Sequence, residues 1–438
     1  MRFPILARFA LVAGVALALL IPLSMIRDKV AERRDRALSV QKDFAGETGG
    51  AQTLAGPFFA LTCEETLDKR RQPCPTELFL PRDLRIEVAA PVEQRHRGIY
   101  PIRLYRAKLV LSGSFDLPPS PAAGGEGRRV WKDVFLVLAI SDVRGIKDAP
   151  GARVGTTDHP FNPGAFDSRI RSGLHSKLGT YADLAGRPEH RFEIPLELVG
   201  TGRLAVAPIG SQNEIEIRSG WPHPSFVGAY PPDRRQVAAG GFSAAWRVNH
   251  FATGGHAYWL DAAAGDTLFS NPRFVGVALV EPVNAYSMSY RATEYGFLFV
   301  LLTFAAFSLV ELAWGVRLHP VQYALTGSAL AVFFLLLIAL SEHIRFGWAY
   351  LAAAGACVAL LGFYLRHPLG SIARTALFAG LFSLLYGALY VLLWSEDHSL
   401  LLGSLLVFGV LAAVMALTRR LDWSALSRRL RQPLADPA

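Results

Sequence analysis

Residues 297–316 have the sequence FLFVLLTFAAFSLVELAWGV, in which Glu311 is the only charged residue. About 20 consecutive apolar residues are enough for a helix to cross the hydrocarbon core of a bilayer. Runs of similar length and composition occupy residues 9–26, 321–340, 346–365, 372–394 and 400–417. We therefore predict an integral membrane α-helical bundle with six transmembrane helices.

The first apolar run follows Arg2 and Arg8 at the N-terminus, which is also typical of a secretory signal peptide. The sequence PLSMIRDKV, which begins at Pro22, contains no small-x-small cleavage site. An uncleaved membrane anchor is therefore the favoured interpretation, and a cleaved signal peptide is the alternative.

Arginine residues predict the orientation, because short cytoplasmic segments of membrane proteins are enriched in Lys and Arg. Only Arg345 lies in the short outer loops that result when the N-terminus is placed inside. Five basic residues in 27–36 oppose this assignment, but the later loops outweigh them. We predict that both termini are cytoplasmic and that the large segment after the first helix is periplasmic. The inner segments contain Arg2, Arg8, Arg317, Arg366, Arg374, Arg419, Arg420, Arg428, Arg429 and Arg431.

The outer segment changes from a helical to a strand-like pattern. Residues 27–48 are polar and predict a juxtamembrane stalk helix, whereas apolar residues alternate in segments such as 102–115, 192–198 and 242–248. Gly- and Pro-rich segments separate these runs, and 119–127 is expected to be a loop. We expect a β-sandwich or open barrel inserted between the first and second transmembrane helices. The predicted parts are the N-terminus with the first transmembrane helix (1–26), the stalk helix (27–48) and the β-rich periplasmic domain (49–294). A five-helix bundle (295–418) and a basic cytoplasmic tail (419–438) follow.

Charge gives no indication of nucleic-acid binding. Residues 27–294 contain 34 Lys and Arg and 30 Asp and Glu, so most of the chain's net charge of +9 comes from the segments predicted to be cytoplasmic. Arginine at those positions anchors helices and meets anionic headgroups. The lipid bilayer is therefore the one partner that composition predicts, and nothing in the sequence indicates an oligomeric state.

Cys63 and Cys74 flank the hydrophilic segment 64–73, which we expect to be a loop between strands. A disulfide is plausible on the oxidising side of the membrane, and two unpaired thiols are the alternative. Cys357 lies in an apolar run and is expected to be a packing residue.

Motifs of familiar enzymes are absent from the sequence. It contains no HExxH, GxSxG or Walker phosphate loop, and its histidines lack the spacing of metal ligands. The loose dinucleotide pattern in 200–205 lies between strand-like segments and fits a hairpin turn better. We predict no catalytic residue, cofactor or metal, and an enzyme is the disfavoured interpretation.

Candidate functional residues fall in two places. Trp221 and His223 belong to the rigid segment WPHPSF at 221–226, which either has a function or seals the end of a sheet. Polar residues of the bundle either form a proton path or stabilise helix ends, and their positions near the interfaces favour the second. Small residues of the fourth span at 352, 355, 356 and 359 are expected to permit close packing. The polar bundle candidates are Glu311, Arg317, His319, Glu342 and His343.

The chain resembles the CreD family of inner-membrane proteins, known as cell envelope integrity proteins, almost from end to end. The resemblance rests on LIPL at 20–23, SGWPHPSF at 219–226, RAT from Arg291, RLHPVQY at 317–323, LSEH at 340–343 and DWSAL at 422–426. It implies a bacterial inner-membrane location, a link to envelope maintenance and, in some relatives, expression controlled by a two-component system. It implies no reaction, but it adds Arg291 to the candidate functional residues; Cys63 and Cys74 lie outside the family pattern.

The favoured function is therefore non-enzymatic. We expect the outer domain to bind an envelope protein, a lipid or a peptidoglycan-related component, and thereby to support envelope integrity or a stress response. A small-molecule or proton-coupled transporter is the first alternative, although no inverted repeat or broken helix is visible. A membrane-embedded enzyme is the second.

Overall fold

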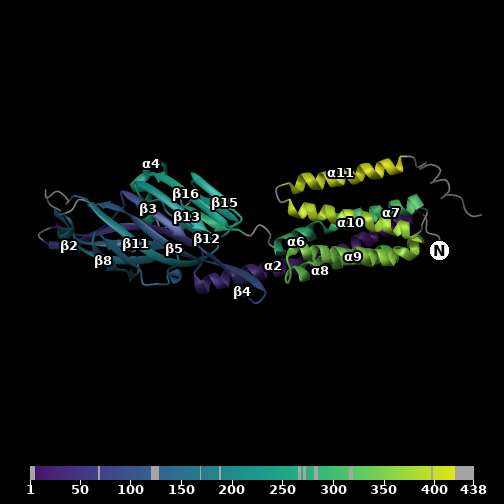
Figure 1. Ribbon diagram of the computed structural model, residues 1–438, viewed down its shortest axis with the longest axis horizontal. Helices are drawn as coiled ribbons and strands as arrows, with labels where there is room; N and C mark the ends of the chain where they lie inside the picture. The colour runs from purple at the N-terminus through teal and green to yellow at the C-terminus, as the bar shows by residue number, and fades with distance from the viewer. Residues whose placement is uncertain are drawn as a thin grey trace, which may run out of the picture. The chain divides into compact units, whose positions relative to one another are not determined.

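The computed structural model describes residues 5–419 except 68–69, 120–127, 168, 187–188, 265–267, 270–272, 281–284, 315–318 and 396–397. Most of the predicted loop 119–127, Arg317 and nearly all of the tail 419–438 thus lie outside the described residues. Residues Met1–Ala37 with Val283–Ala438 form one compact unit, and Leu38–Pro282 form a second. The first is helical and the second consists mainly of β-sheet (Figure 1).

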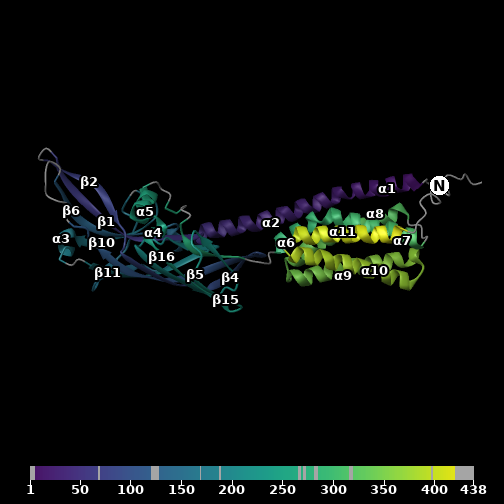
Figure 2. The same cartoon turned by 90° about the horizontal axis from the view of Figure 1, so that it is seen from above.

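Eight helices of the described part of the chain contribute to the helical unit, and the residues of α2 from Leu38 onward are assigned to the second unit. Only Leu19 separates α1 from α2, so the apolar N-terminal run and the polar segment after it form nearly continuous helix (Figure 2). Their bounds are α1 (Ile5–Ala18), α2 (Leu20–Thr48), α6 (Ala285–Glu294), α7 (Gly296–Trp314), α8 (Pro320–Ser341), α9 (Phe346–Leu369), α10 (Ile372–Trp394) and α11 (Ser399–Thr418).

Within the described residues, four helical segments are long and apolar enough to cross a membrane: Leu11–Thr48, Pro320–Ser341, Phe346–Leu369 and Ile372–Trp394. Shorter apolar helical stretches cover Gly296–Ser308 and Leu400–Ala416. Large apolar side chains also point outward from the bundle; Phe363 is 82% exposed and Leu400 is 87% exposed. Surfaces of this composition are stable when lipid covers them. The helical unit is therefore a membrane bundle.

Packing of helix α9 (Phe346–Leu369) differs from the expectation. The small residues at 352, 355, 356 and 359 are exposed, whereas Ala349, Ala353 and Cys357 are buried. Tyr350 on the same buried face donates a hydrogen bond to the carbonyl oxygen of Tyr386, at 2.7 Å. The predicted packing face was wrong because small residues occur on several faces of α9, and the aromatic neighbours select one of them.

The β-sheet unit contains two sheets. In the eight-stranded sheet the order is β14-β17-β12-β1-β6-β10-β9, with β2 paired to β1. Its strands are β1 (Gln52–Leu67), β2 (Arg70–Phe79), β6 (Arg128–Ile140), β9 (Asn162–Pro163), β10 (Gly173–Thr180), β12 (Arg203–Val206), β14 (Pro224–Gly228) and β17 (Val275–Leu279).

The nine-stranded sheet has the order β15-β16-β13-β3-β5-β11-β7-β8, with β4 paired to β5. Its strands are β3 (Asp83–Ala89), β4 (Val92–Arg97), β5 (Tyr100–Asp116), β7 (Gly151–Val154), β8 (Thr157–Pro160), β11 (Glu189–Thr201), β13 (Gln212–Ser219), β15 (Arg234–Ala238) and β16 (Gly241–Asn249). Short helices are η1 (Val143–Gly145), α3 (Tyr181–Leu184), α4 (His250–Thr253) and α5 (Gly255–Ala264).

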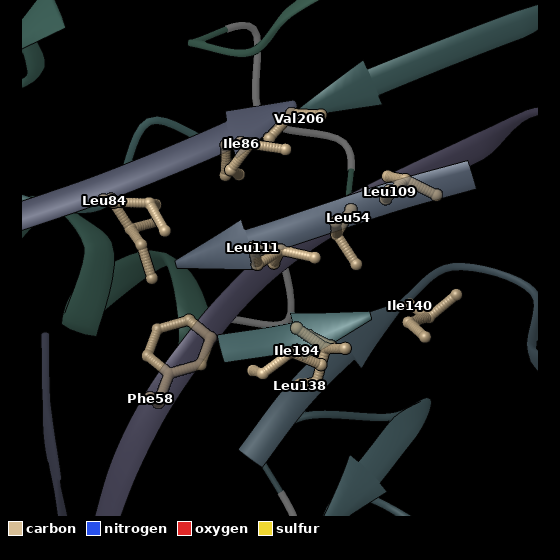
Figure 3. Packing of buried hydrophobic residues seen from close by; sticks show 14 of the residues in the cluster. Leu54, Phe58, Leu84, Ile86, Leu109, Leu111, Leu138, Ile140, Ile194 and Val206 are labelled. Carbon is tan, nitrogen blue, oxygen red and sulfur yellow. The ribbon is translucent and has the colours of Figure 1, made fainter. Parts of the chain in front are cut away.

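One hydrophobic core draws on both sheets. Alternate residues of β11 are buried from His190 onward, because successive side chains of a strand point to opposite faces. Phe58 and Leu138 of one sheet lie in the same cluster as Ile86 and Leu111 of the other (Figure 3). This arrangement gives the unit an interior of its own.

The expected loop at 64–73 is mostly strand. Strands β1 and β2 continue through it as an antiparallel pair that places Cys63 opposite Cys74, and a disulfide joins them with a Cα–Cα distance of 5.3 Å. Cross-strand ion pairs explain how so polar a segment forms a ladder. Lys132 of β6 lies 2.9 Å from Glu64, and Arg129 lies 3.5 Å from Glu65.

Candidate functional site

Trp221 lies in the connection between β13 and β14 and fastens it to the end of β17. Its indole Nε1 donates hydrogen bonds to the carbonyl oxygens of His223, at 3.0 Å, and Val280, at 3.1 Å. The backbone N–H of Val280 in turn donates to the carbonyl oxygen of His223. The two prolines of the segment restrict its backbone further. Trp221 therefore fixes the segment before β14 to the residue that follows β17, at one end of this pair of strands in the eight-stranded sheet.

Arg103 of β5 covers the ring of Trp221. Its guanidinium carbon lies 4.6 Å from the ring centroid, within the range of a cation–π interaction. His223 meets the same ring edge-on at 6.0 Å between centroids and is exposed. This cluster of Arg103, Trp221 and His223 joins the two sheets. Sequence reasoning missed Arg103, because nothing in the alternating pattern of β5 distinguishes it from the other arginines there.

The candidate Glu342, at one end of the bundle, takes part in an ion pair. Glu342 caps the C-terminus of α8, and its carboxylate lies 3.9 Å from the guanidinium of Arg33 on α2. The side chain of Glu342 is only 11% exposed, whereas His343 beside it is exposed. The carboxylate is thus held next to a cation at the helix end.

A second ion pair joins α2 to α6. Arg27 lies 3.3 Å from Glu294 and donates a hydrogen bond to the hydroxyl of Tyr290, while the guanidinium of Arg34 lies 5.2 Å from the Tyr290 ring. The family-like residue Arg291 is half-buried on α6, next to Tyr290. Sequence reasoning missed Tyr290 and Glu294, because their partners are more than 250 residues away in the chain.

His319 caps the opposite end of α8. Its Nδ1 accepts a hydrogen bond from the N–H of Val321, and its own N–H donates to Gln322 at 2.8 Å. Helix α8 contains 22 residues, so about 33 Å separates His319 from Glu342. Glu311 lies on α7, but its side chain, like all of Arg317, is outside the described residues. The structure does not bring the described polar bundle candidates together into one site.

The chemistry available to these groups is limited. Among the described residues, no three His, Cys, Asp or Glu side chains are arranged to hold a metal ion. His223 has the aromatic ring of Trp221 as its neighbour, and His319 uses its ring nitrogen as a helix cap. Trp221, His319 and Glu342 thus contribute to a sheet, a helix end and an ion pair, respectively.

The chain is similar to known proteins over almost its whole length. The model of a family described as "Inner membrane protein CreD" matches residues 4–424. The inner membrane protein CreD of Escherichia coli (strain K12) is 33% identical to the chain, over 98% of this chain and 95% of the relative.

Proposed function

Because the chain belongs to the CreD family of inner-membrane proteins, we propose that it contributes to envelope integrity or to the envelope stress response without catalysing a reaction. Its β-sheet unit binds another component of the envelope, and its helices anchor that unit in the inner membrane. We further propose six transmembrane helices, cytoplasmic termini and a periplasmic β-sheet unit inserted between the first two helices.

One observation favours an anchor over a proton-coupled transporter: Glu342 and His319 lie at the two ends of α8 and have structural partners. Glu342 faces Arg33, and His319 caps α8. A proton path needs ionisable groups at intermediate depth, with contacts that change during transport. Helix caps and interfacial ion pairs instead hold an anchor together.

The surface of the β-sheet unit offers a contact residue for such binding. Phe251 in α4 is 83% exposed, although moving a phenylalanine side chain out of water is energetically favourable. Its ring packs against His250 at 4.0 Å between centroids, which holds it in place. An exposed aromatic held in this way is well suited to bind a partner.

A complementation experiment tests the proposal. The gene is deleted, sensitivity to detergents and antibiotics is scored, and the full-length chain or one of its variants is restored at equal level. We expect F251D to lose rescue and F251L, which keeps an apolar side chain, to retain most of it. The double variant E311Q/E342Q is expected to rescue fully when its protein level is normal, because an anchor needs no titrating carboxylate and loss of one ion pair at 3.9 Å costs it only a small part of its stability. Loss of rescue in E311Q/E342Q with normal protein level would favour proton-coupled transport and contradict the proposal.

A further inference from the structure

A pocket of about 680 Å³ lies at the end of the bundle where α8 begins, α9 ends and α10 begins. Gly370 adopts a left-handed conformation with φ 63° and reverses the chain between α9 and α10. This turn places Arg366 and His367, from the last turn of α9, in the same pocket as Ser371 and Ile372. Gln322 of α8 completes the wall.

The lining of this pocket favours an anion. Among the described residues, its lining contains Arg366 and His367, both exposed, but no Asp or Glu. The first backbone N–H groups of α10 lack acceptors within the helix, and the side chain of Ser371 does not cap them. A guanidinium and free helical N–H groups are the donors that proteins use to bind phosphate.

Apolar groups lie beside these donors. Phe363, 82% exposed, and Ile372, 71% exposed, line the same pocket. A molecule with a charged head and an apolar tail would satisfy both kinds of surface. Basic pockets between membrane helices commonly bind the headgroups of anionic lipids.

We propose that this pocket binds a phosphate-bearing anion, through Arg366, His367 and the N-terminus of α10. The phosphate comes either from the headgroup of an anionic phospholipid or from a soluble phosphate compound. Binding would hold α8, α9 and α10 together at this end of the bundle. The proposal concerns the helical unit and does not depend on what the β-sheet unit binds.

Ligand-dependent thermal unfolding tests the proposal with the purified full-length chain in detergent. Short-chain phosphatidylglycerol, short-chain phosphatidylcholine and inorganic phosphate are titrated separately. The variant R366Q/H367Q removes the side-chain donors, and R366K keeps the positive charge. R345Q is the matched control, because Arg345 is an exposed arginine at the opposite end of α9.

We expect phosphatidylglycerol to raise the unfolding temperature of the wild type and of R345Q. Apparent affinity should fall at least about tenfold in R366Q/H367Q, as expected when one charge-assisted hydrogen bond is lost, and should largely be kept in R366K. Stabilisation by inorganic phosphate with the same variant pattern would support the site and assign it to a soluble anion. Equal responses of R366Q/H367Q and R345Q, or no response of the wild type to either anion, would overturn the proposal.

Discussion

Trp221 shows how a short motif can be structural although its composition suggests a binding site. The ring is held by two hydrogen bonds and by the guanidinium of Arg103 at 4.6 Å. The ring is only partly buried, and two backbone carbonyl groups accept hydrogen bonds from its N–H. The exposed ring of His223 is the part of the segment that is free to meet a partner.

Substitutions at Trp221 and His223 distinguish a structural role of this segment from a role in binding a partner. We expect W221A to lower the free energy of unfolding by about 2–4 kcal/mol, since it removes a large packed ring and a cation–π contact. W221F keeps the ring and should lose about 1 kcal/mol, while H223A should change stability by less than about 0.5 kcal/mol. Thermal unfolding of the full-length variants measures this order.

Loss of envelope function without loss of stability would instead assign Trp221 to partner binding. If W221A unfolds like the wild type but fails to restore envelope function, the indole contacts a partner and does not close the sheet. H223A then serves as the control, because it alters the exposed part of the same segment without touching the hydrogen bonds of Trp221.

The basic residues after the first apolar run have a physical explanation at the residue scale. They oppose the orientation predicted from the other arginines, yet Arg27 pairs with Glu294 and Arg33 faces Glu342. Local carboxylates partly offset these positive charges. The sequence contained the charges but not the pairing, because Glu294 and Glu342 lie far along the chain.

Strands and membrane helices could be predicted because their patterns are local. Alternation in 192–198 corresponds to the buried positions of β11, and the long apolar runs correspond to helices α8 to α10. The strands at 64–73 could not be predicted, since their polar residues pair with partners far along the chain, such as Arg129 and Lys132 of β6. Strand order in the two sheets likewise depends on contacts between distant segments.

The packing face of α9 is the clearest failure of prediction from local pattern. In water, apolar side chains mark the buried face of a helix, but in lipid both faces are apolar. Small residues then occur on either face, and only the neighbouring helices distinguish them. Ala353 is fully buried, whereas its neighbour Ala352 is exposed.

These two alanines allow a matched test of the packing of α9. We expect A353L to lower stability by about 1–3 kcal/mol, because three additional heavy atoms must enter a filled interface. A352L adds the same atoms on the exposed face and should leave the unfolding temperature nearly unchanged. Thermal unfolding in detergent compares them directly. Greater damage from A352L would mean that another surface covers the face exposed in the structure.

At the scale of the whole molecule, the two units have surfaces suited to different surroundings: lipid for the helical unit and water for the β-sheet unit. The helical unit exposes large apolar side chains, and the β-sheet unit buries its own in a core shared by two sheets. Arg366 lies in the last turn of α9 and Arg374 in the first turn of α10, whereas Arg345 lies at the other end of α9. This distribution predicts that the α9–α10 turn is cytoplasmic and the β-sheet unit periplasmic.

Accessibility of single engineered thiols tests that orientation. Native Cys357 is buried, and Cys63 and Cys74 are joined, so a new surface cysteine gives a distinct signal. I99C lies at an exposed turn of the β-sheet unit, and H367C is exposed at the α9–α10 turn. We expect a membrane-impermeant maleimide to label I99C in intact spheroplasts and H367C only after permeabilisation. The opposite result would place the β-sheet unit in the cytoplasm, where neither a periplasmic partner nor a stable disulfide could be maintained.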